Sequence, residues 1–301
     1  MDLLDRFRGA LLGLACGDAV GTAVEFKARG TFPPLTGMIG GGPFDLKPGE
    51  WTDDTSMALC LAASLIETKG FDARDQMERY LKWSEEGYLS SNGSCFDIGL
   101  TIGSALRRYK RTGDPFSGST DPTSAGNGSL MRLAPIVLFY YPDRDLCLNF
   151  SSESSRTTHG TLECLDACRL FSDMLFRALD GAGKENILLG SPSGLVSAKI
   201  LKSIARGSYF DKPTSEILGL GYVVKSLEAA LWCFWKTDTF EQAILTAANL
   251  GDDADTTAAI CGQIAGAFYG ENSIPVSWLN QLVMKNEIGK MAEQLGSIGK
   301  T

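Results

Sequence analysis

Two segments near opposite ends of the chain carry small residues at every fourth position. These residues are Gly9, Gly13, Gly17 and Gly21 in the first segment, and Ala258, Gly262, Gly266 and Gly270 in the second. Glycine costs a helix interior about 1 kcal/mol relative to alanine, so the repeat needs a compensating reason. Residues four apart share one helix face, where small side chains let a neighbouring backbone approach closely. We therefore predict that both segments are helices at the centre of a bundle, although Gly21 and Gly270 could instead end them.

Apolar residues recur at helical spacing through most of the chain, whereas alternating strand-like runs are hard to find. This pattern predicts an all-α fold in a single domain over residues 1–301. The predicted helices cover residues 3–20, 55–68, 73–86, 97–111, 128–140, 143–155, 161–179, 194–206, 221–235, 239–249, 254–269 and 283–295. The connections at 28–51, 112–127, 180–193 and 207–219 are too short to be interdomain linkers, and no internal period appears.

The composition disfavours nucleic acid and membrane partners. Lys and Arg number 28 against 36 Asp and Glu, and the resulting net charge of −8 would repel a phosphate backbone. The apolar stretch at 258–269 is too short to span a bilayer, and acidic residues flank the one at 10–16, so no secretory signal is expected. Eight cysteines without a Cys-x-x-Cys pair indicate reduced core residues and a cytoplasmic location. The acidic surface favours a monomer.

Two acidic clusters, Thr52-Asp53-Asp54 and Asp253-Ala254-Asp255-Thr256, stand where predicted helices begin. Each cluster alone is more typical of a helix cap. A cap needs one carboxylate, however, and the two segments with Asp252 hold five. Packed carboxylates repel one another, and a cation relieves the repulsion. Oxygen ligands without a nearby His or Cys favour Mg²⁺, Mn²⁺ or Ca²⁺ over zinc, so facing clusters could hold a metal pair.

Three further features leave a functional and a structural interpretation open. The glycine-rich turn at 126–129 enters the predicted helix 128–140 and could bind a phosphate through its N–H groups, but Asn-Gly is also a common turn. The only histidine, His159, lies between predicted helices beside a polar turn, where a structural role is the more common one. Asp97, at the start of the predicted helix 97–111, is typical of an N-cap.

Taken together, these motifs resemble those of the ADP-ribosylglycohydrolases, which include the arginine-specific dinitrogenase reductase-activating branch. The resemblance covers nearly the whole chain. In chain order, the matching segments are Gly9 to Gly21 with Asp18 and Glu25, Trp51 to Thr55, Gly126 to Arg132, Thr158-His159, and Gly251 to Thr256 with the helix behind it. The resemblance implies a compact orthogonal bundle of α-helices with two Mg²⁺ or Mn²⁺ ions at its centre.

The resemblance also implies roles for individual residues. The implied metal ligands are Thr52, Asp53, Asp54, Asp253, Asp255 and Thr256. The implied reaction hydrolyses the bond between the anomeric ribose carbon of ADP-ribose and an acceptor, with Asp54 or Asp253 activating the water and Glu25 as a second candidate base. The implied contacts to the diphosphate or distal ribose are Gly126, Asn127, Gly128, Ser129 and Met131, with His159 lining the nucleotide channel.

The segment from Ser91 to Gly99 resembles the Gly-x-Cys-Phe-Asp-Ile-Gly segment of the arginine-specific branch. There Asp97 would pair with the guanidinium of the leaving arginine. The expected substrate is therefore a protein ADP-ribosylated on arginine, and the product is ADP-ribose. ADP-ribosyl-serine, O-acetyl-ADP-ribose, and a non-catalytic ADP-ribose-binding or toxin-blocking role remain alternatives. Asp252, where the family more often has glycine, is a departure of open significance.

Overall fold

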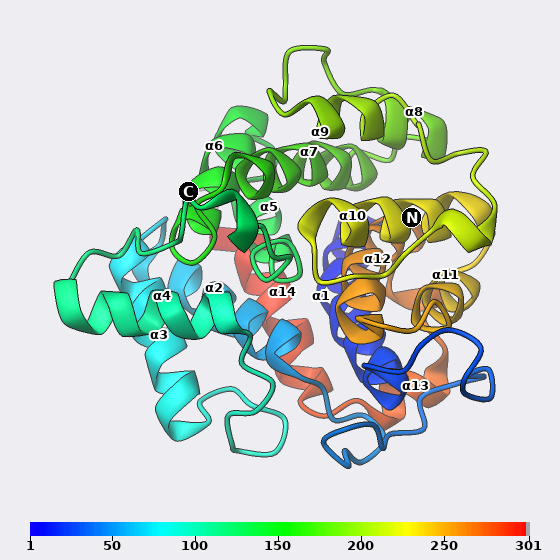
Figure 1. Ribbon diagram of the computed structural model, residues 1–301, viewed down its shortest axis with the longest axis horizontal. Coiled ribbons are helices and arrows are strands. Elements are labelled where there is room, and N and C mark those ends of the chain that lie inside the picture. The colour runs from blue at the N-terminus through cyan, green and yellow to red at the C-terminus, as the bar shows by residue number, and fades with distance from the viewer. Residues whose placement is uncertain (299–301) are drawn as a thin grey trace.

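The structure is a computed structural model that describes residues 1–298, and it is built from helices (Figure 1). The α-helices are α1 Leu3–Gly21, α2 Asp53–Thr68, α3 Ala73–Glu86, α4 Leu100–Thr112, α5 Ala134–Tyr140, α6 Arg144–Arg156, α7 Leu162–Leu179, α8 Lys184–Leu189, α9 Lys199–Ile204, α10 Val223–Lys236, α11 Phe240–Ala248, α12 Ala254–Tyr269, α13 Val276–Gln281 and α14 Lys285–Ile298. Short 3-10 helices cover Thr22–Val24, Pro122–Ser124, Thr214–Glu216 and Glu271–Ser273. Pairing of the β type within the described residues is limited to isolated bridges. The all-α prediction is confirmed.

Helices α1 and α12 lie side by side at the centre of the molecule, with their small-residue stripes in contact (Figure 1). A Cβ atom on Gly266 would lie 1.9 Å from the carbonyl oxygen of Gly9, and one on Gly262 would lie 2.1 Å from that of Gly13. Only a hydrogen atom fits in such a gap. The prediction of two central helices is therefore confirmed. Of the two end positions, Gly270 does follow the last residue of α12, with a positive φ of 80°.

Helix α1 is apolar on nearly all sides because other helices surround it. The stretch Leu3–Val24 is long and apolar enough to cross a membrane by composition, but 94% of its most apolar window is buried inside the protein. An all-round apolar helix in a globular protein is typical of a core element. This stretch is also longer than the one at 258–269 that the sequence analysis considered.

Helix α5 begins at Ala134, six residues later than the predicted start at 128. A proline, Pro135, occupies its first turn, where the missing N–H removes no helix hydrogen bond. The preceding turn is held by Gln263 of α12, whose amide donates to the carbonyl of Met131 over 2.7 Å and accepts from the N–H of Ala134 over 2.7 Å. A lone polar residue in an otherwise apolar helix was the sequence signal for this contact.

Other elements also differ from the prediction, and α9, Lys199–Ile204, is shorter at both ends than the helix predicted over 194–206. Helix α8 lies in a predicted connection and α13 was missed, because six residues are too few to show a helical period. Helix α4 begins at Leu100, with Gly99 in the cap position and Asp97 outside the helix at a left-handed φ of 57°. The interpretation of Asp97 as an N-cap is therefore wrong, and its carboxylate is free for another role.

Candidate metal centre

The N-terminal ends of α2 and α12 bring the two acidic clusters together. Neither cluster caps its own helix, because Thr52 and Asp253 hold the cap positions without a side-chain cap hydrogen bond. Instead, the hydroxyl of Thr256 donates to Asp54 Oδ2 over 3.3 Å, and that of Thr52 lies 3.3 Å from Asp255 Oδ2. The clusters thus face each other as predicted, and the capping interpretation is wrong for both.

An acidic residue outside both clusters, Asp18 of α1, positions the first cluster. Its Oδ1 accepts from the N–H and the hydroxyl of Thr52, each over 2.9 Å. Its Oδ2 accepts from the N–H of Thr55 over 3.0 Å and from the Thr55 hydroxyl over 2.6 Å. Asp18 therefore supplies the cap of α2 from a different helix and fixes the backbone that carries Asp53 and Asp54. No role was predicted for Asp18 from the sequence, although a carboxylate inside an apolar helix was the available signal.

Several buried carboxylate oxygens in this cluster have no hydrogen-bond partner within residues 1–298, namely Asp54 Oδ1, Asp255 Oδ1 and Glu25 Oε2. Ligand oxygens of Asp18, Asp54 and Asp255 lie within 4.8 Å of one another, and so do those of Glu25, Asp97 and Asp255. A buried carboxylate without donors is costly unless a cation compensates it. Hard divalent cations take such oxygen ligands, so the residues present fit a metal centre.

Burial and mutual repulsion raise the pKa of the clustered carboxyl groups. Desolvation followed by the charge of Asp97 raises the pKa of Glu25 to about 9, and desolvation followed by the charge of Asp253 raises the pKa of Asp97 to about 7. Desolvation, followed by the charge of Asp18, holds the pKa of Asp54 well above the ordinary range, and desolvation followed by the charge of Glu25 does the same for Asp255. Without a cation, the folded cluster therefore retains protons at neutral pH that a bound metal would replace.

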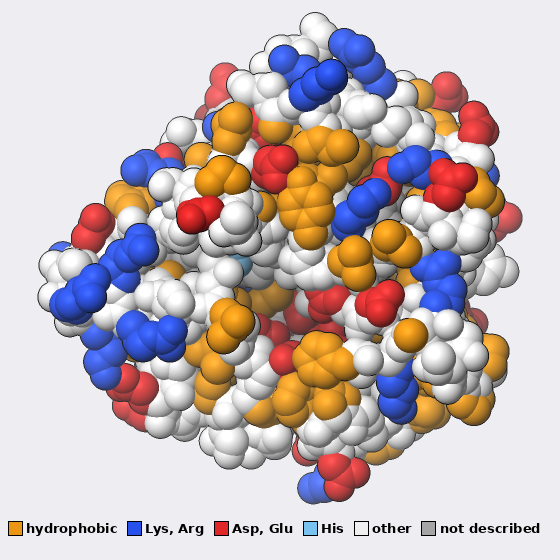
Figure 2. All heavy atoms as spheres, viewed as in Figure 1, with side chains coloured by type: hydrophobic (Ala, Val, Ile, Leu, Met, Phe, Trp, Pro, Cys, Tyr) orange, Lys and Arg blue, Asp and Glu red, His pale blue; other side chains and the backbone are white. Residues whose placement is uncertain are grey.

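A cavity of about 550 Å³ opens beside the cluster. Figure 2 shows acidic side chains on the floor of this hollow, with apolar side chains around it. The predicted site residues that line it are Glu25, Asp53, Asp97, Gly126, Asn127, Gly128, Met131, His159, Asp253 and Thr256. Thr52, Asp54 and Asp255 are buried and do not line it. The metal-side and substrate-side residues predicted from the sequence thus meet at one cavity wall.

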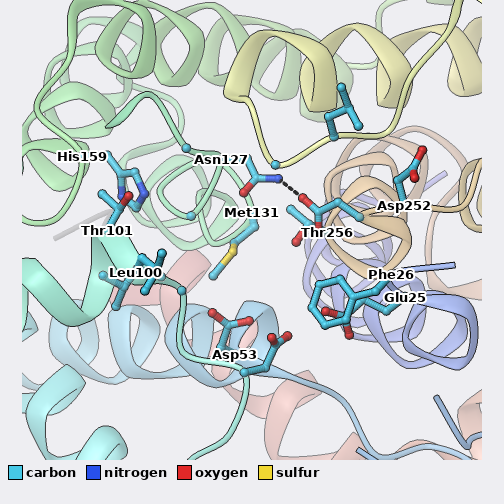
Figure 3. Close-up of a pocket in the computed structure, with 18 residues that line it drawn as sticks. Glu25, Phe26, Asp53, Leu100, Thr101, Asn127, Met131, His159, Asp252 and Thr256 are labelled. Carbon is cyan, nitrogen blue, oxygen red and sulfur yellow. Dashed lines mark hydrogen bonds between the residues drawn. The ribbon is translucent and has the colours of Figure 1, made fainter. Parts of the chain in front are cut away.

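The glycine-rich turn contacts both the cavity and the acidic cluster. Asn127 Nδ2 donates to Asp253 Oδ2 over 2.6 Å, which orients that carboxylate (Figure 3). Because α5 begins only at Ala134, the prediction of a helix N-terminus at this turn is wrong. Two free donors nevertheless remain, since the N–H groups of Gly128 and Ser129 have no hydrogen-bond partner in the described part of the chain.

The side chain of Ser129 does not line the cavity. Its hydroxyl lies 2.8 Å from that of Ser155 and accepts from the thiol of Cys168 over 3.5 Å. The hydroxyl of Ser155 in turn donates to the carbonyl of His159 over 2.8 Å. The hydroxyl of Ser129 therefore lies behind the backbone of His159, and of this residue only the backbone N–H remains for the predicted contact with substrate.

Asp252 lines the cavity but belongs to neither group of clustered carboxylates. Its φ of 56° is left-handed, a conformation that glycine adopts freely and that aspartate tolerates better than most residues. Its backbone pairs with the loop after Glu25, donating to the carbonyl of Lys27 over 2.8 Å and accepting from the N–H of Phe26 over 2.7 Å. The departure from glycine therefore leaves the local backbone intact.

Comparison with known proteins gives a consistent result over almost the whole chain. Residues 1–300 match the family model of the ADP-ribosylglycohydrolases. The ADP-ribosylarginine hydrolase Tri1 of Serratia proteamaculans is 44% identical, over 97% of this chain and 79% of its own. The ADP-ribosyl-dinitrogen reductase glycohydrolase of Rhodospirillum rubrum is 33% identical, over 94% of this chain and 92% of its own. A solved structure, an ADP-ribosylglycohydrolase-related protein complex, matches with a TM-score of 0.88 at 44% identity, covering 99% of both chains.

Proposed function

The chain belongs to the ADP-ribosylglycohydrolase family, and from this membership we propose that it hydrolyses the bond between ADP-ribose and an arginine side chain of a modified protein. The reaction reverses mono-ADP-ribosylation. The observation that carries the choice of arginine is Asp97, a partly exposed carboxylate that lines the cavity beside the acidic cluster. Since this carboxylate is crowded by others, a guanidinium is the kind of group that its position favours. No predicted metal ligand is lost, which supports catalysis over a purely blocking role.

The carboxylates that line the cavity and those buried behind its wall are suited to different roles. Cleavage develops positive charge at the anomeric carbon, which the carboxylates that line the cavity can stabilise. Asp253 and Glu25 line the cavity, whereas Asp54 is fully buried and does not line it, so we assign water activation to Asp253 or Glu25 and a supporting role to Asp54. Two bound divalent cations, Mg²⁺ or Mn²⁺, would supply Lewis-acid chemistry at this wall. The residues that would hold them are Thr52, Asp53, Asp54, Asp253, Asp255 and Thr256.

The apolar border of the cavity supports a protein substrate over a small molecule. Phe26 is 67% exposed and Leu100 is 89% exposed, and both line the cavity. Large apolar side chains that stay exposed around a polar pocket commonly contact another macromolecule. They would lie against the polypeptide on either side of the modified arginine.

Release of ADP-ribose from arginine-, serine- and cysteine-linked peptides tests the acceptor. We expect turnover of the arginine-linked peptide, and we expect Asp97→Asn to lower its kcat/KM about 10- to 100-fold, the loss typical of one charged hydrogen bond. Affinity for free ADP-ribose should not change. Faster turnover of the serine-linked peptide, or an unchanged rate in the variant, would contradict the proposal.

Asp252→Asn is the matched control for Asp97→Asn. Both residues line the same cavity and both have a left-handed φ, but Asp252 lies outside the clustered carboxylates. Its variant should keep the wild-type rate. If Asp97 instead holds a metal ion, Asp97→Asn will weaken Mn²⁺ binding in titration calorimetry, whereas a guanidinium partner leaves that affinity unchanged.

The raised pKa values predict how pH affects the metal-free protein. The pKa of Asp97 is raised to about 7 and that of Glu25 to about 9, against about 4 in an unfolded chain. The folded state therefore binds more protons than the unfolded state over this range, and its stability falls as pH rises through it. We expect the Tm in EDTA to fall between about pH 5 and 9, and Mg²⁺ or Mn²⁺ to raise it more at about pH 8 than at pH 6. Thermal-shift measurements test this, and a pH-independent metal effect would contradict it.

We further propose that the protein acts as a cytoplasmic monomer. All eight cysteines are free, and only Cys95 is not buried. Unpaired cysteines are typical of a reducing compartment. Sedimentation of the purified protein would test the monomer.

A further inference from the structure

Arg132 is a fully buried cation behind the substrate cavity. Its partners within residues 1–298 are neutral: it donates to the carbonyl of Gly128 over 2.7 Å and to the hydroxyl of Thr158 over 2.7 Å, and it lies over the ring of Tyr80 at 4.8 Å. Burying a charge without an opposite charge is costly. A functional role would explain the buried charge of Arg132, and the contact between its partner Thr158 and His159 indicates that role.

The surroundings of the buried Thr158 hydroxyl favour one direction for its hydrogen bonds. Arginine donates and cannot accept, so the Thr158 oxygen accepts from Arg132. The oxygen could accept a second hydrogen bond, but its own hydrogen would then be buried without an acceptor, because His159 Nδ1, at 2.8 Å, is the only acceptor that the described residues offer it. Nδ1 must accept this hydrogen, so a neutral ring carries its own hydrogen on Nε2. Burial and the positive charge of Arg132 lower the pKa of His159 to about 3, which keeps the ring neutral.

The Nε2 atom faces the cavity side of the ring. A Cβ atom on Gly126 would lie 3.3 Å from Nε2, and one on Gly128 would lie 3.2 Å from it, so both glycines leave room for the ring. His159 lines the cavity (Figure 3), and Nε2 has no hydrogen-bond partner in the described part of the chain. An oxygen of a ligand in the cavity is therefore a suitable acceptor for this N–H.

From this geometry we propose that Arg132 and Thr158 are positioning residues that fix His159 as the Nε2–H tautomer, which donates a hydrogen bond to an oxygen of ADP-ribose. The inference rests on the proposed function for the identity of the ligand. The opposite tautomer would turn a lone pair towards the ligand, which repels a phosphate oxygen and leaves a hydroxyl as the only partner. Arg132 thus acts through Thr158 without touching the ligand.

Because the chain has a single histidine, ¹⁵N-histidine NMR of the whole protein reads the two ring nitrogens without overlap. In the wild type we expect a hydrogen on Nε2 and none on Nδ1. Thr158→Val removes the hydroxyl at nearly the same shape, and should shift the Nδ1 resonance to that of a nitrogen without a hydrogen bond. The same variant should weaken ADP-ribose binding about tenfold. Thr158→Ser should restore both.

Thr157→Val is the matched control. Thr157 is equally buried, and its hydroxyl accepts from Arg132 over 3.3 Å and donates to the carbonyl of Ser154 over 2.7 Å, away from the ring of His159. Its variant should leave both the Nδ1 resonance and the affinity unchanged. If the wild-type protein carries the ring hydrogen on Nδ1, the proposal is overturned. This measurement does not depend on whether any variant folds. A Thr158→Val protein with wild-type resonance and affinity would overturn the proposal as well. Failure of arginine hydrolysis alone would not affect the NMR result, so the two proposals can fail separately.

Discussion

Gly266→Ala should destabilise the protein by about 3 kcal/mol, the upper end of the range for overpacked cores, out of a total of about 5–15 kcal/mol for a typical protein. The added Cβ would lie 1.9 Å from the carbonyl oxygen and 2.5 Å from the carbonyl carbon of Gly9. Both are backbone atoms that cannot rotate away, so α1 and α12 must move apart along the whole contact. Urea unfolding of the metal-free protein measures the effect, because it separates packing from metal binding.

Gly103→Ala is the matched control for this prediction. Gly103 also lies buried inside a helix, α4, but an added Cβ would meet only the flexible end of Arg107, at 3.2 Å. Alanine has the better helix propensity by about 1 kcal/mol, so this variant should be unchanged or more stable. The same substitution, Gly→Ala, should therefore lower the free energy of unfolding at Gly266 and leave it unchanged or raise it at Gly103. Equal effects would mean that the close helix contact is not what requires glycine.

Asp54→Ala and Asp253→Ala should each lower de-ADP-ribosylation at least about a thousandfold, since Lewis-acid stabilisation at a catalytic centre amounts to several kcal/mol. The fold should survive. Asp54 Oδ1 is buried without a partner in the described residues, so removing the carboxylate from the metal-free protein relieves repulsion. The Asp54 variant should therefore be at least as stable as the wild type in EDTA, and both variants should lose the stabilisation by Mn²⁺.

Release of ADP-ribose and thermal unfolding, each with and without Mn²⁺, measure the two effects together. Wild-type activity in EDTA, or activity retained in both variants, would contradict the metal centre. Loss of stability in EDTA would contradict the assignment of Asp54 as a repelled carboxylate.

The features predicted correctly from the sequence share one property, which is that each leaves a repeated local signal. The stripe at Gly13 and Gly17 is unfavourable in an isolated helix, so it indicates a close partner, and only one other segment carries a matching stripe. The acidic clusters contain more carboxylates than capping requires, which indicated a shared cation. In both cases the chain has more residues of one kind, glycines or carboxylates, than local structure requires. That excess predicted a contact with a distant segment.

The features that were missed depend on single side chains that reach across the fold. Gln263 holds the turn before α5, and Asp18 caps a helix that begins more than thirty residues later. The side chain of Arg132 donates to the carbonyl of Gly128, which in a helix would accept from the backbone N–H four residues later. No local pattern records these contacts, because each depends on the tertiary position of one polar residue. A buried polar residue in an apolar run is the one signal that all three left.

The pairing of α1 with α12 also determines when the protein can become active. Synthesis runs from the N-terminus to the C-terminus, so Gly9 leaves the ribosome well before Gly266, which lies 257 residues further along the chain. Until α12 is made, the small-residue stripe of α1 has no partner. A helix that is apolar enough to cross a membrane is then not yet packed in the core. Asp255, which both carboxylate groups share, is also made late. Nascent chains therefore need shielding from aggregation until α12 has been made, and chains truncated before α12 lack the Asp255 carboxylate that both groups share.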